Sequence, residues 1–454
     1  MLTMHPPCIL EPMKIEKSEC VIKSYSFDAT GIVFEPEGVV FAESEKDVID
    51  TVRHCLKTKT PVIPRGAGSG FTGGSLPVKG GILLSLERLN RIIDIDTKNM
   101  VAEVEAGVVT GELRKSVESF GFYYPPDPSS LEFSTIGGNI AENAGGPRAV
   151  KYGVTGDYVL GIKAVLGTAE VIDTTKRLKK NVVGYNLTPL FVGSEGTLGV
   201  ITRALLKIIP KPETRRLILS YFPELTEAGK AVTEIMASGI KPSALEIMDR
   251  ASVECVKRYK GFSIPQNTEA ILLIEVDGTK EEVRKYAREI VKILKAHSAK
   301  TKTARNEKEE EEVWALRRAI SPSLLHIAPT KINEDVVVPV DKMAQALDAF
   351  RKIGKLYGVP VVCFGHAGDG NIHVNVMTDE KDERLFERAK KAVREIFIAT
   401  VALGGSLSGE HGIGITKEKF LPIQVKKEEI HLWRRIKKAF DPENIINPGK
   451  MGLI

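Results

Sequence analysis

The chain has 454 residues, which exceeds what one hydrophobic core usually supports, so two or three domains are expected. Hydrophobic residues make up 43% and charged residues 27% of the sequence, as in ordinary soluble globular proteins. Its 64 basic and 59 acidic residues leave a formal charge of +5 without a long block of one sign, which argues against a nucleic-acid partner.

The first half of the sequence predicts short helices alternating with short strands. Apolar residues recur at helical spacing from Val48 to Leu56. The other elements expected before residue 125 are strands at 61–63, 81–86 and 100–105 and a helix at 111–120.

Residues 125–156 are crowded with Pro, Gly, Asn and Ser and predict a long loop. A loop of this length inside a compact domain is usually functional or disordered, and its interleaved Ile136, Ile140 and Val150 favour order around a ligand. A strand at 201–210 then ends in Lys-Pro-Glu, where we place a domain boundary.

Beyond residue 210 the elements follow a β-α-β-β-α-β order, which is the ferredoxin-like arrangement. A small helix at 253–259 interrupts it, and a charged helix (307–325), a strand (332–338) and a helix (343–357) follow. The six elements of the arrangement are expected at 216–222, 224–238, 244–248, 270–276, 280–296 and 300–304.

A glycine-rich loop contains a formal G-x-G-x-x-G pattern at Gly68, Gly70 and Gly73. In a Rossmann fold a helix must follow such a loop, but here the next predicted element is the strand at 82–86. The Rossmann interpretation therefore fails. A backbone N–H nest for phosphate oxygens and a long structural turn both remain open.

Three of the eight histidines fall in two short glycine-rich segments. His366 and His373 stand seven residues apart, and Glu410 and His411 follow downstream. A His/His/Glu set suits a catalytic divalent metal, and His411 is then left free to handle protons. The alternation of Ile372, Val374 and Val376 with His373 and Asn375 predicts a strand that turns His373 and Asn375 to one face, with His366 in the preceding turn.

The alternative for each histidine alone is that it caps a turn or satisfies a buried hydrogen bond. Asp369 is equally interpretable as a metal ligand or as part of a Gly-Asp-Gly turn. The H-E-x-x-H motif is absent from the sequence, so a metalloprotease is not supported.

Five motifs between Val39 and Pro210 together resemble the FAD-binding domain of the vanillyl-alcohol oxidase and p-cresol methylhydroxylase type. They occur at 64–75, 125–130, 136–146, 151–157 and 193–202. The resemblance implies an α+β fold and FAD, bound without a covalent link because residues 65–75 contain neither His nor Cys. The cofactor-binding residues that it implies are Pro64, Arg65, Gly66, Gly68, Ser69, Gly70, Thr72, Gly73, Gly74, Ser75, Pro126, Asp127, Gly137, Gly138, Asn139, Ala144, Gly145, Gly153, Thr155, Glu195, Gly199, Val200, Ile201 and Asn447.

The two histidine segments resemble the C-terminal signature of FAD-linked D-2-hydroxyacid dehydrogenases, which include D-lactate dehydrogenase, D-2-hydroxyglutarate dehydrogenase and the flavin subunit of glycolate oxidase. This resemblance implies that His366, His373 and Glu410 hold a divalent metal, expected to be zinc, and that His411 is the catalytic base. It also implies three parts: an FAD-binding domain of two α+β subdomains (1–210), a substrate or cap domain with an antiparallel sheet (211–405) and a helical C-terminal segment that returns to the flavin (406–454).

The same resemblance implies substrate contacts from Arg317, Ser321, Lys331 and Asn375. Arg317 and Ser321 lie one helical turn apart on one face, and a guanidinium fork suits a carboxylate. The neighbouring Arg318 is expected to lie on a solvated charged face. Where relatives commonly show Thr, this chain has Ser321, which leaves substrate choice open.

The expected reaction is metal-assisted oxidation of a D-2-hydroxy acid, such as D-lactate, D-2-hydroxyglutarate or glycolate, to the 2-oxo acid, with hydride passing to flavin N5. His411 would take the hydroxyl proton. The alternatives are a non-dehydrogenase flavoprotein on the same fold (an ether-lipid synthase relative or an electron-transfer flavin subunit) and a plain metal-binding or scaffold protein, which predicts no bound flavin.

Electrons must leave such a protein through a separate acceptor. The five cysteines (Cys8, Cys20, Cys55, Cys255 and Cys363) are scattered and form no C-x-x-C pair, which favours a reducing compartment and argues against an iron–sulfur cluster on this chain. The acceptor is expected to be an iron–sulfur subunit, an electron-transfer flavoprotein, a cytochrome or a quinone. The sequence predicts a cytoplasmic protein and leaves open a homodimer and peripheral attachment to the inner face of the membrane through a partner.

Overall fold

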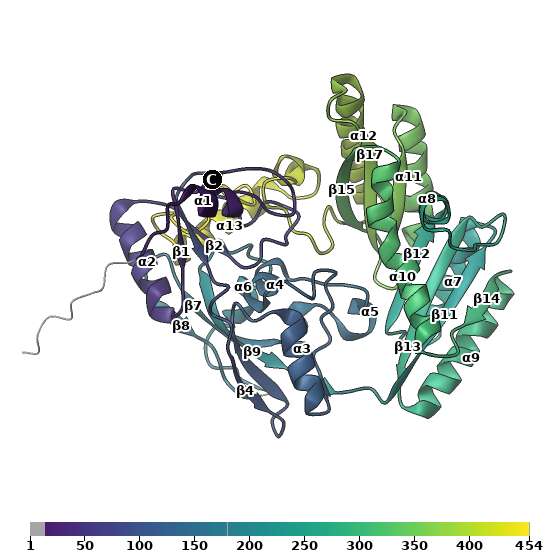
Figure 1. The fold of residues 1–454 in the computed structure, drawn as a ribbon, viewed down its shortest axis with the longest axis horizontal. Helices are drawn as coiled ribbons and strands as arrows, with labels where there is room; N and C mark the ends of the chain where they lie inside the picture. The colour runs from purple at the N-terminus through teal and green to yellow at the C-terminus, as the bar shows by residue number, and fades with distance from the viewer. Residues whose placement is uncertain (1–13, 179, 454) are drawn as a thin grey trace, which may run out of the picture.

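The computed structural model describes residues 14–178 and 180–453, so Cys8 lies outside the described residues. Figure 1 shows two lobes side by side: the N-terminal half, and a sheet-and-helix body that follows it. The C-terminal segment lies on the N-terminal half and reaches towards the second lobe. No helix in the described ranges is both long and apolar enough to cross a lipid bilayer.

The N-terminal half contains two sheets of different type. A parallel sheet has the order β1-β3-β2, and an antiparallel sheet has the order β4-β5-β9-β7-β8. A short antiparallel pair, β6 with β10, forms a separate two-stranded sheet. The strands are β1 (Gly38–Phe41), β2 (Val62–Arg65), β3 (Ile82–Ser85), β4 (Ile92–Asp96), β5 (Val101–Glu105), β6 (Phe122–Tyr123), β7 (Val159–Val165), β8 (Val171–Asp173), β9 (Val200–Lys207) and β10 (Ile209–Pro210).

Helix α2 shows how the sequence sets these elements. Ser44 and Asp47 form a reciprocal capping box at its start, and Lys59 ends it in the left-handed conformation. Its buried side chains include Val48 and Val52, as the helical spacing predicts. The helices of this half are α1 (Glu19–Tyr25), α2 (Glu45–Thr58), α3 (Thr110–Ser119), α4 (Ile136–Glu142), α5 (Ala149–Tyr152) and α6 (Thr188–Phe191).

Residues 125–156 are less loop-like than their composition predicts, because they contain α4 and α5. Helix α4 forms despite two glycines, since Thr135 caps its start through the Gly138 N–H and its apolar face is buried. The strand β2 leads into β3 through the glycine loop with no intervening helix, as expected when the Rossmann interpretation is rejected.

The second lobe is built on a seven-stranded antiparallel sheet with the order β14-β11-β13-β12-β16-β17-β15. Its first four strands, with α7 and α9, form the predicted ferredoxin-like arrangement. The strands are β11 (Thr214–Phe222), β12 (Ala244–Asp249), β13 (Ala270–Gly278), β14 (Lys300–Thr303), β15 (Thr330–Val337), β16 (Val361–His366) and β17 (Asn371–Thr378).

The two faces of this sheet are covered differently. One face packs against α7, α9, α11 and α12 in the largest apolar core. The other face packs partly against α8 and α10, and its remaining part carries polar side chains. The helices are α7 (Leu225–Ala237), α8 (Arg250–Lys260), α9 (Lys280–Ala296), α10 (Glu307–Ser323), α11 (Met343–Tyr357) and α12 (Glu383–Ala402).

The C-terminal segment joins the two lobes. Ser406 pairs with Val337 at the edge of β15. Helix α13 (Lys427–Phe440) then packs on the N-terminal half, where the buried Lys437 donates to the Thr197 carbonyl at 2.7 Å. The segment between them, residues 408–414, is therefore held between the sheet and the N-terminal half. The division of the chain at residues 210 and 405 stays a prediction.

Candidate functional site

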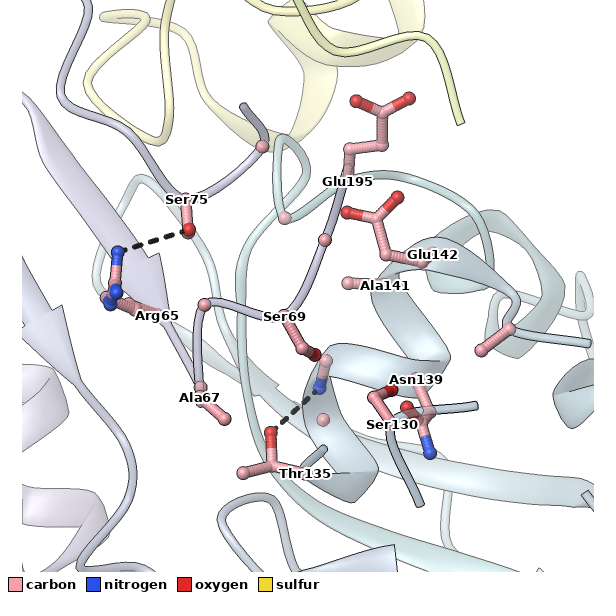
Figure 2. A pocket seen from close by; sticks show the side chains of 18 of the residues that line it. Arg65, Ala67, Ser69, Ser75, Ser130, Thr135, Asn139, Ala141, Glu142 and Glu195 are labelled. Carbon is pink, nitrogen blue, oxygen red and sulfur yellow. Dashed lines mark hydrogen bonds between the residues drawn. The ribbon is translucent and has the colours of Figure 1, made fainter. Parts of the chain in front are cut away.

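A large cavity lies in the N-terminal half, next to the glycine loop. It encloses about 1150 Å³ of space, part of it open to solvent. Figure 2 shows Ser69 of the glycine loop and Asn139 and Glu142 of α4 around this space. Close approach of main chain depends on glycine here, because a Cβ on Gly74 would lie 2.9 Å from Glu142 Oε1 and one on Gly66 would lie 2.2 Å from Thr135 Oγ1.

Sixteen of the residues predicted to bind the cofactor line this cavity. The guanidinium of Arg65 is held in its wall by a hydrogen bond to Ser75 Oγ and by the ring of Tyr25. The sixteen are Pro64, Arg65, Gly66, Gly68, Ser69, Gly70, Gly74, Ser75, Gly137, Gly138, Asn139, Ala144, Gly145, Glu195, Gly199 and Ile201.

The other eight predicted cofactor residues do not line the cavity, and two of them bind its wall. Asn447 Nδ2 donates to the carbonyls of Gly74 and Glu195, and Thr155 Oγ1 donates to the Ala144 carbonyl, all at 2.8 Å. Thr72 and Val200 are fully buried. The remaining four are Gly73, Pro126, Asp127 and Gly153.

Several lining residues were missed by the sequence analysis, although most lie inside the motifs that it identified. Glu142 is the main case, because its Oε2 is buried and has no partner among the described residues. Burial and the neighbouring Glu195 raise the pKa of Glu142 well above its ordinary value. Others are Ala67, Phe71, Leu86, Pro128, Ser129, Ser130, Thr135, Ala141 and Gly196.

His366, His373 and Glu410 meet on the polar face of the sheet. His366 Nε2 and His373 Nε2 lie 3.4 Å apart, and Glu410 Oε1 lies 3.6 Å and 3.5 Å from them. The three donor atoms thus form a nearly equilateral triangle. His366 was predicted to lie in the turn before β17. It is instead the last residue of β16, because that strand continues through Gly365 to pair with β17.

Two of the three groups in this triangle, Glu410 and His373, have the protonation states of metal ligands. Burial alone would raise the pKa of Glu410, but the three surrounding imidazoles lower it to about 2. Burial lowers the pKa of His373 to about 3, which keeps that ring neutral. Burial alone would lower the pKa of His366, but the carboxylate of Glu246 raises it well above its ordinary value. An ionised carboxylate and a neutral imidazole are typical metal ligands.

Glu246 was not identified from the sequence, although it joins two parts of the site. This fully buried residue of β12 lies 2.5 Å from His366 Nδ1 through Oε1 and accepts from Arg317 Nε at 2.6 Å through Oε2. Its position directly opposite His366 in the pairing of β12 with β16 is visible only once the strands are paired.

Asp335 is a second residue that the sequence analysis missed. Its Oδ2 accepts the backbone N–H groups of Gly409, Glu410 and His411 at 2.6, 2.7 and 3.2 Å. His411 Nδ1 lies 3.3 Å from its Oδ1, and the buried Lys417 pairs with the same oxygen. This one carboxylate therefore fixes both the backbone and the imidazole of the segment that carries Glu410 and His411.

His411 lies between the cavity and the triangle. The centroid of its ring lies 4.9 Å from the ring centroid of Phe71 in the glycine loop and 5.7 Å from the ring centroid of His373. Glu410 and His411 both line the cavity, and a Cβ on Gly145 would lie 3.0 Å from Glu410 Oε2. The structure thus places one corner of the triangle, Glu410, and the neighbouring imidazole of His411 in the wall of the cavity.

The four residues predicted to contact substrate lie on or beside the polar face. Arg317 lies over the Phe364 ring at 4.5 Å, and Lys331 Nζ donates to Ser321 Oγ at 3.0 Å. Asn375 donates to the Val362 carbonyl, while its buried Oδ1 has no partner among the described residues. Arg318, in contrast, pairs with Glu311 on the exposed side of α10.

Comparisons with known proteins agree with this architecture. Residues 36–175 match the model of an FAD binding domain, and residues 211–451 match that of the C-terminal domain of FAD-linked oxidases. The chain is 41% identical to glycolate oxidase subunit GlcD of Bacillus subtilis, over 94% of this chain and 91% of that one. It is 33% identical to D-lactate dehydrogenase of Anaerostipes hadrus, over 97% and 95%.

A similar fold occurs in a solved structure of p-cresol methylhydroxylase with substrate bound. The TM-score is 0.75 at 18% identity, with 97% of this chain and 94% of that chain covered. This likeness confirms the predicted α+β architecture and does not bear on the reaction.

Proposed function

From the premise that the chain belongs to the FAD-linked oxidases and is an FAD-dependent oxidoreductase, we propose that it oxidises a small D-2-hydroxy acid to the 2-oxo acid. The observation that carries the proposal is that the His366–His373–Glu410 triangle reaches the wall of the cofactor cavity through Glu410, next to His411 in the same wall. Bound FAD supplies the acceptor for the two electrons. Relatives named glycolate oxidase subunit and D-lactate dehydrogenase support this substrate class.

In this proposal His366, His373 and Glu410 hold a divalent metal, with zinc as the expected ion. Ligand atoms of a tetrahedral zinc ion, each about 2.1 Å from the metal, lie about 3.4 Å apart. The distances of 3.4, 3.5 and 3.6 Å between the three donor atoms fit that requirement. Glu246 beside His366 Nδ1 supplies the carboxylate that commonly orients a metal-bound histidine. When bound, the metal supplies Lewis acidity towards the substrate hydroxyl.

Arg317, Ser321, Lys331 and Asn375 are proposed to bind the substrate carboxylate and orient its α-carbon. Arg317 Nε donates to Glu246. The two terminal nitrogens of the guanidinium donate to no described residue, so they remain for an anion. The Asn375 Oδ1 supplies an additional buried acceptor. These groups lie on or beside the sheet face that carries the triangle.

His411 is proposed as the base that accepts the hydroxyl proton. Asp335 holds its Nδ1 side, which leaves Nε2 to face away from that carboxylate. A separate electron acceptor completes the cycle, and the relatives named as subunits support a protein partner in that role. The domain division at 210 and 405 and a cytoplasmic location, with or without attachment to the membrane through that partner, belong to the same proposal.

Anaerobic flavin reduction tests the proposal. Purified protein is mixed with D- and L-lactate, D- and L-2-hydroxyglutarate and glycolate, and bleaching of the flavin absorbance is followed. We expect rapid bleaching by at least one D-acid or glycolate, slow or no bleaching by the L-acids, and loss of activity on chelation with recovery on adding zinc. Absence of bleaching by every acid would reject the substrate class, and full activity of metal-free protein would reject the metal.

A further inference from the structure

Arg148 links the cofactor cavity to the helix that carries the proposed substrate-binding residues. It precedes α5 in the N-terminal half, and its guanidinium pairs with Asp127 on one side. On the other side, Nη2 donates to both carboxylate oxygens of Glu275 in β13, at 3.1 and 3.3 Å. A single side chain therefore bridges the two lobes, and only 14% of it is exposed.

The link continues from Glu275 to α10. Trp314 Nε1 donates to Glu275 Oε2 at 3.3 Å, and the Arg148 guanidinium lies 5.7 Å from the Trp314 ring. Trp314 lies three residues before Arg317 and seven before Ser321, on the same side of α10. Since a tryptophan held by both a hydrogen bond and a cation is fixed in rotation, the turn of α10 that presents Arg317 is fixed as well.

The cofactor end of the link is anchored independently of Arg148. Asp127 directly precedes Pro128, which lines the cavity, and Asp127 also accepts from Arg114 Nη1 at 2.8 Å. Arg114 Nη2 donates to the Pro126 carbonyl at 2.8 Å as well. Removing Arg148 therefore leaves the cavity wall held by Arg114, but leaves α10 without its connection to that wall.

We propose that Arg148 is a positioning residue, which holds the substrate-binding face of α10 at a fixed place relative to the bound cofactor through Glu275 and Trp314. The proposal deepens the proposed function, because it rests on Arg317 and Ser321 contacting the substrate. Geometry of this kind affects substrate binding and the rate of flavin reduction, because small misplacements of a bound substrate slow the reaction. It does not affect the affinity for FAD.

A second ion pair between the same two lobes provides a matched control. Lys151 Nζ donates to Asp277 Oδ1 and to the Asp277 carbonyl, and Tyr152 donates to the other carboxylate oxygen. This pair joins α5 to the end of β13 as the Arg148 pair does, but no described contact connects it to α10. Lys151→Gln therefore removes an interlobe ion pair without touching Trp314.

The experiment compares Arg148→Gln, Trp314→Phe and Lys151→Gln with the wild type, each as FAD-loaded protein. We expect Arg148→Gln to raise KM for the hydroxy acid and to lower the limiting rate of flavin reduction, each about tenfold, with the FAD Kd within about threefold of wild type. Trp314→Phe, which keeps an aromatic ring but loses the N–H, is expected to show a smaller change of the same kind. The double variant Arg148→Gln/Trp314→Phe should have the same KM and the same rate of flavin reduction as Arg148→Gln alone, since both substitutions act through one link. Lys151→Gln should resemble the wild type.

Hydrogen exchange of residues 307–323 gives a readout that does not depend on the substrate. Exchange should rise in Arg148→Gln and stay at the wild-type level in Lys151→Gln, whichever acid the enzyme oxidises. The proposal is overturned if Arg148→Gln binds and oxidises substrate like the wild type, or if its exchange rises no more than that of Lys151→Gln. It is also overturned if its main effect is loss of FAD. If no acid bleaches the flavin but the exchange pattern is as expected, the proposed function fails and the positioning of α10 stands.

Discussion

The cofactor cavity and the polar sheet face are formed by different types of residue. Nine of the residues that line the cavity are glycines, so main chain forms much of its wall. The sheet face instead gathers ionisable side chains, among them Glu246 and Asp335, which are fully buried. A wall of N–H groups suits a large cofactor with many oxygens, whereas a small substrate that must lose a proton requires charged groups at defined places. The two regions meet at Glu410 and His411.

The largest expected effect comes from His411, at this meeting point. His411→Gln should slow flavin reduction by substrate by about 10²–10⁴-fold, because a positioned base contributes an effect of that size. The variant should keep its yellow colour and its metal, since no described hydrogen bond of the cavity or of the triangle depends on the ring. Stopped-flow reduction under anaerobic conditions measures the rate.

His431→Gln is the control for this substitution, because His431 is an exposed histidine on α13. It should reduce at the wild-type rate. If His411→Gln also reduces at that rate, His411 is not the base and the sheet face contributes only binding.

The same contrast explains which parts were predictable from the sequence. Most of the cavity wall comes from short contiguous motifs. The resemblance of these motifs to a known FAD-binding domain was therefore enough to predict the wall residues within 65–75 and 137–145. Alternation in β17 likewise predicted correctly that His373 and Asn375 share a face, because a strand has a period of two. The ferredoxin-like order followed from the sequence of elements.

The partners of those residues were not predictable in the same way. Glu246 lies 120 residues before His366, and Asp335 lies 76 residues before His411, so no local pattern joins them. A carboxylate in a strand is usually exposed, and only the pairing of β12 with β16 and the crossing of the C-terminal segment over β15 show that these two are buried.

Asp335→Asn tests whether the sheet face depends on its buried charges. Burial would raise the pKa of Asp335, but His411, Lys417 and backbone N–H groups hold it well below its usual range. The substitution removes the closer charged partner of the buried Lys417 ammonium and leaves only the Glu334 carboxylate, 3.8 Å away. Breaking this buried pair should cost up to about 3–5 kcal/mol of unfolding free energy. Denaturant unfolding measures the loss.

Asp94→Asn is the matched control, because Asp94 pairs with Arg177 at an exposed site. Its cost should be below about 0.5 kcal/mol. Equal stability of the two variants would mean that Asp335 is dispensable to the sheet face, and that the segment carrying Glu410 is held by other contacts.

A pair of glycine substitutions separates the two regions. A Cβ on Gly74 would lie 2.9 Å from Glu142 Oε1, whereas one on Gly409 would lie 1.9 Å from Asn371 Nδ2 and 2.6 Å from Val337. Overpacking of this kind typically costs about 1–3 kcal/mol.

Gly74→Ala should weaken FAD binding about tenfold with metal content unchanged. Gly409→Ala should weaken metal binding about tenfold with the FAD Kd unchanged. Fluorescence titration with FAD and metal analysis after dialysis give both values, and each variant is the control for the other. Loss of both ligands in either variant would show that the regions are one cooperative unit.

The helix-covered face of the same sheet offers the smallest effect and the clearest contrast. His297 lies between α7 and α9, 2.9 Å from Glu227 and 2.8 Å from Glu234. Burial lowers the pKa of His297, but hydrogen bonds to the two carboxylates outweigh burial and raise it above its ordinary value of 6.5. A raised pKa in the folded state means that the stabilisation is fully present below that ordinary value and is lost as the pH rises through the folded pKa.

His297→Gln should therefore be less stable than the wild type by at most about 1 kcal/mol in acidic buffer and equally stable in alkaline buffer. Denaturant midpoints at both pH values measure the difference, and a deficit that does not change with pH would assign the effect to packing. Flavin reduction should be unaffected at either pH, because charges on this face stabilise the scaffold without reaching the cofactor cavity.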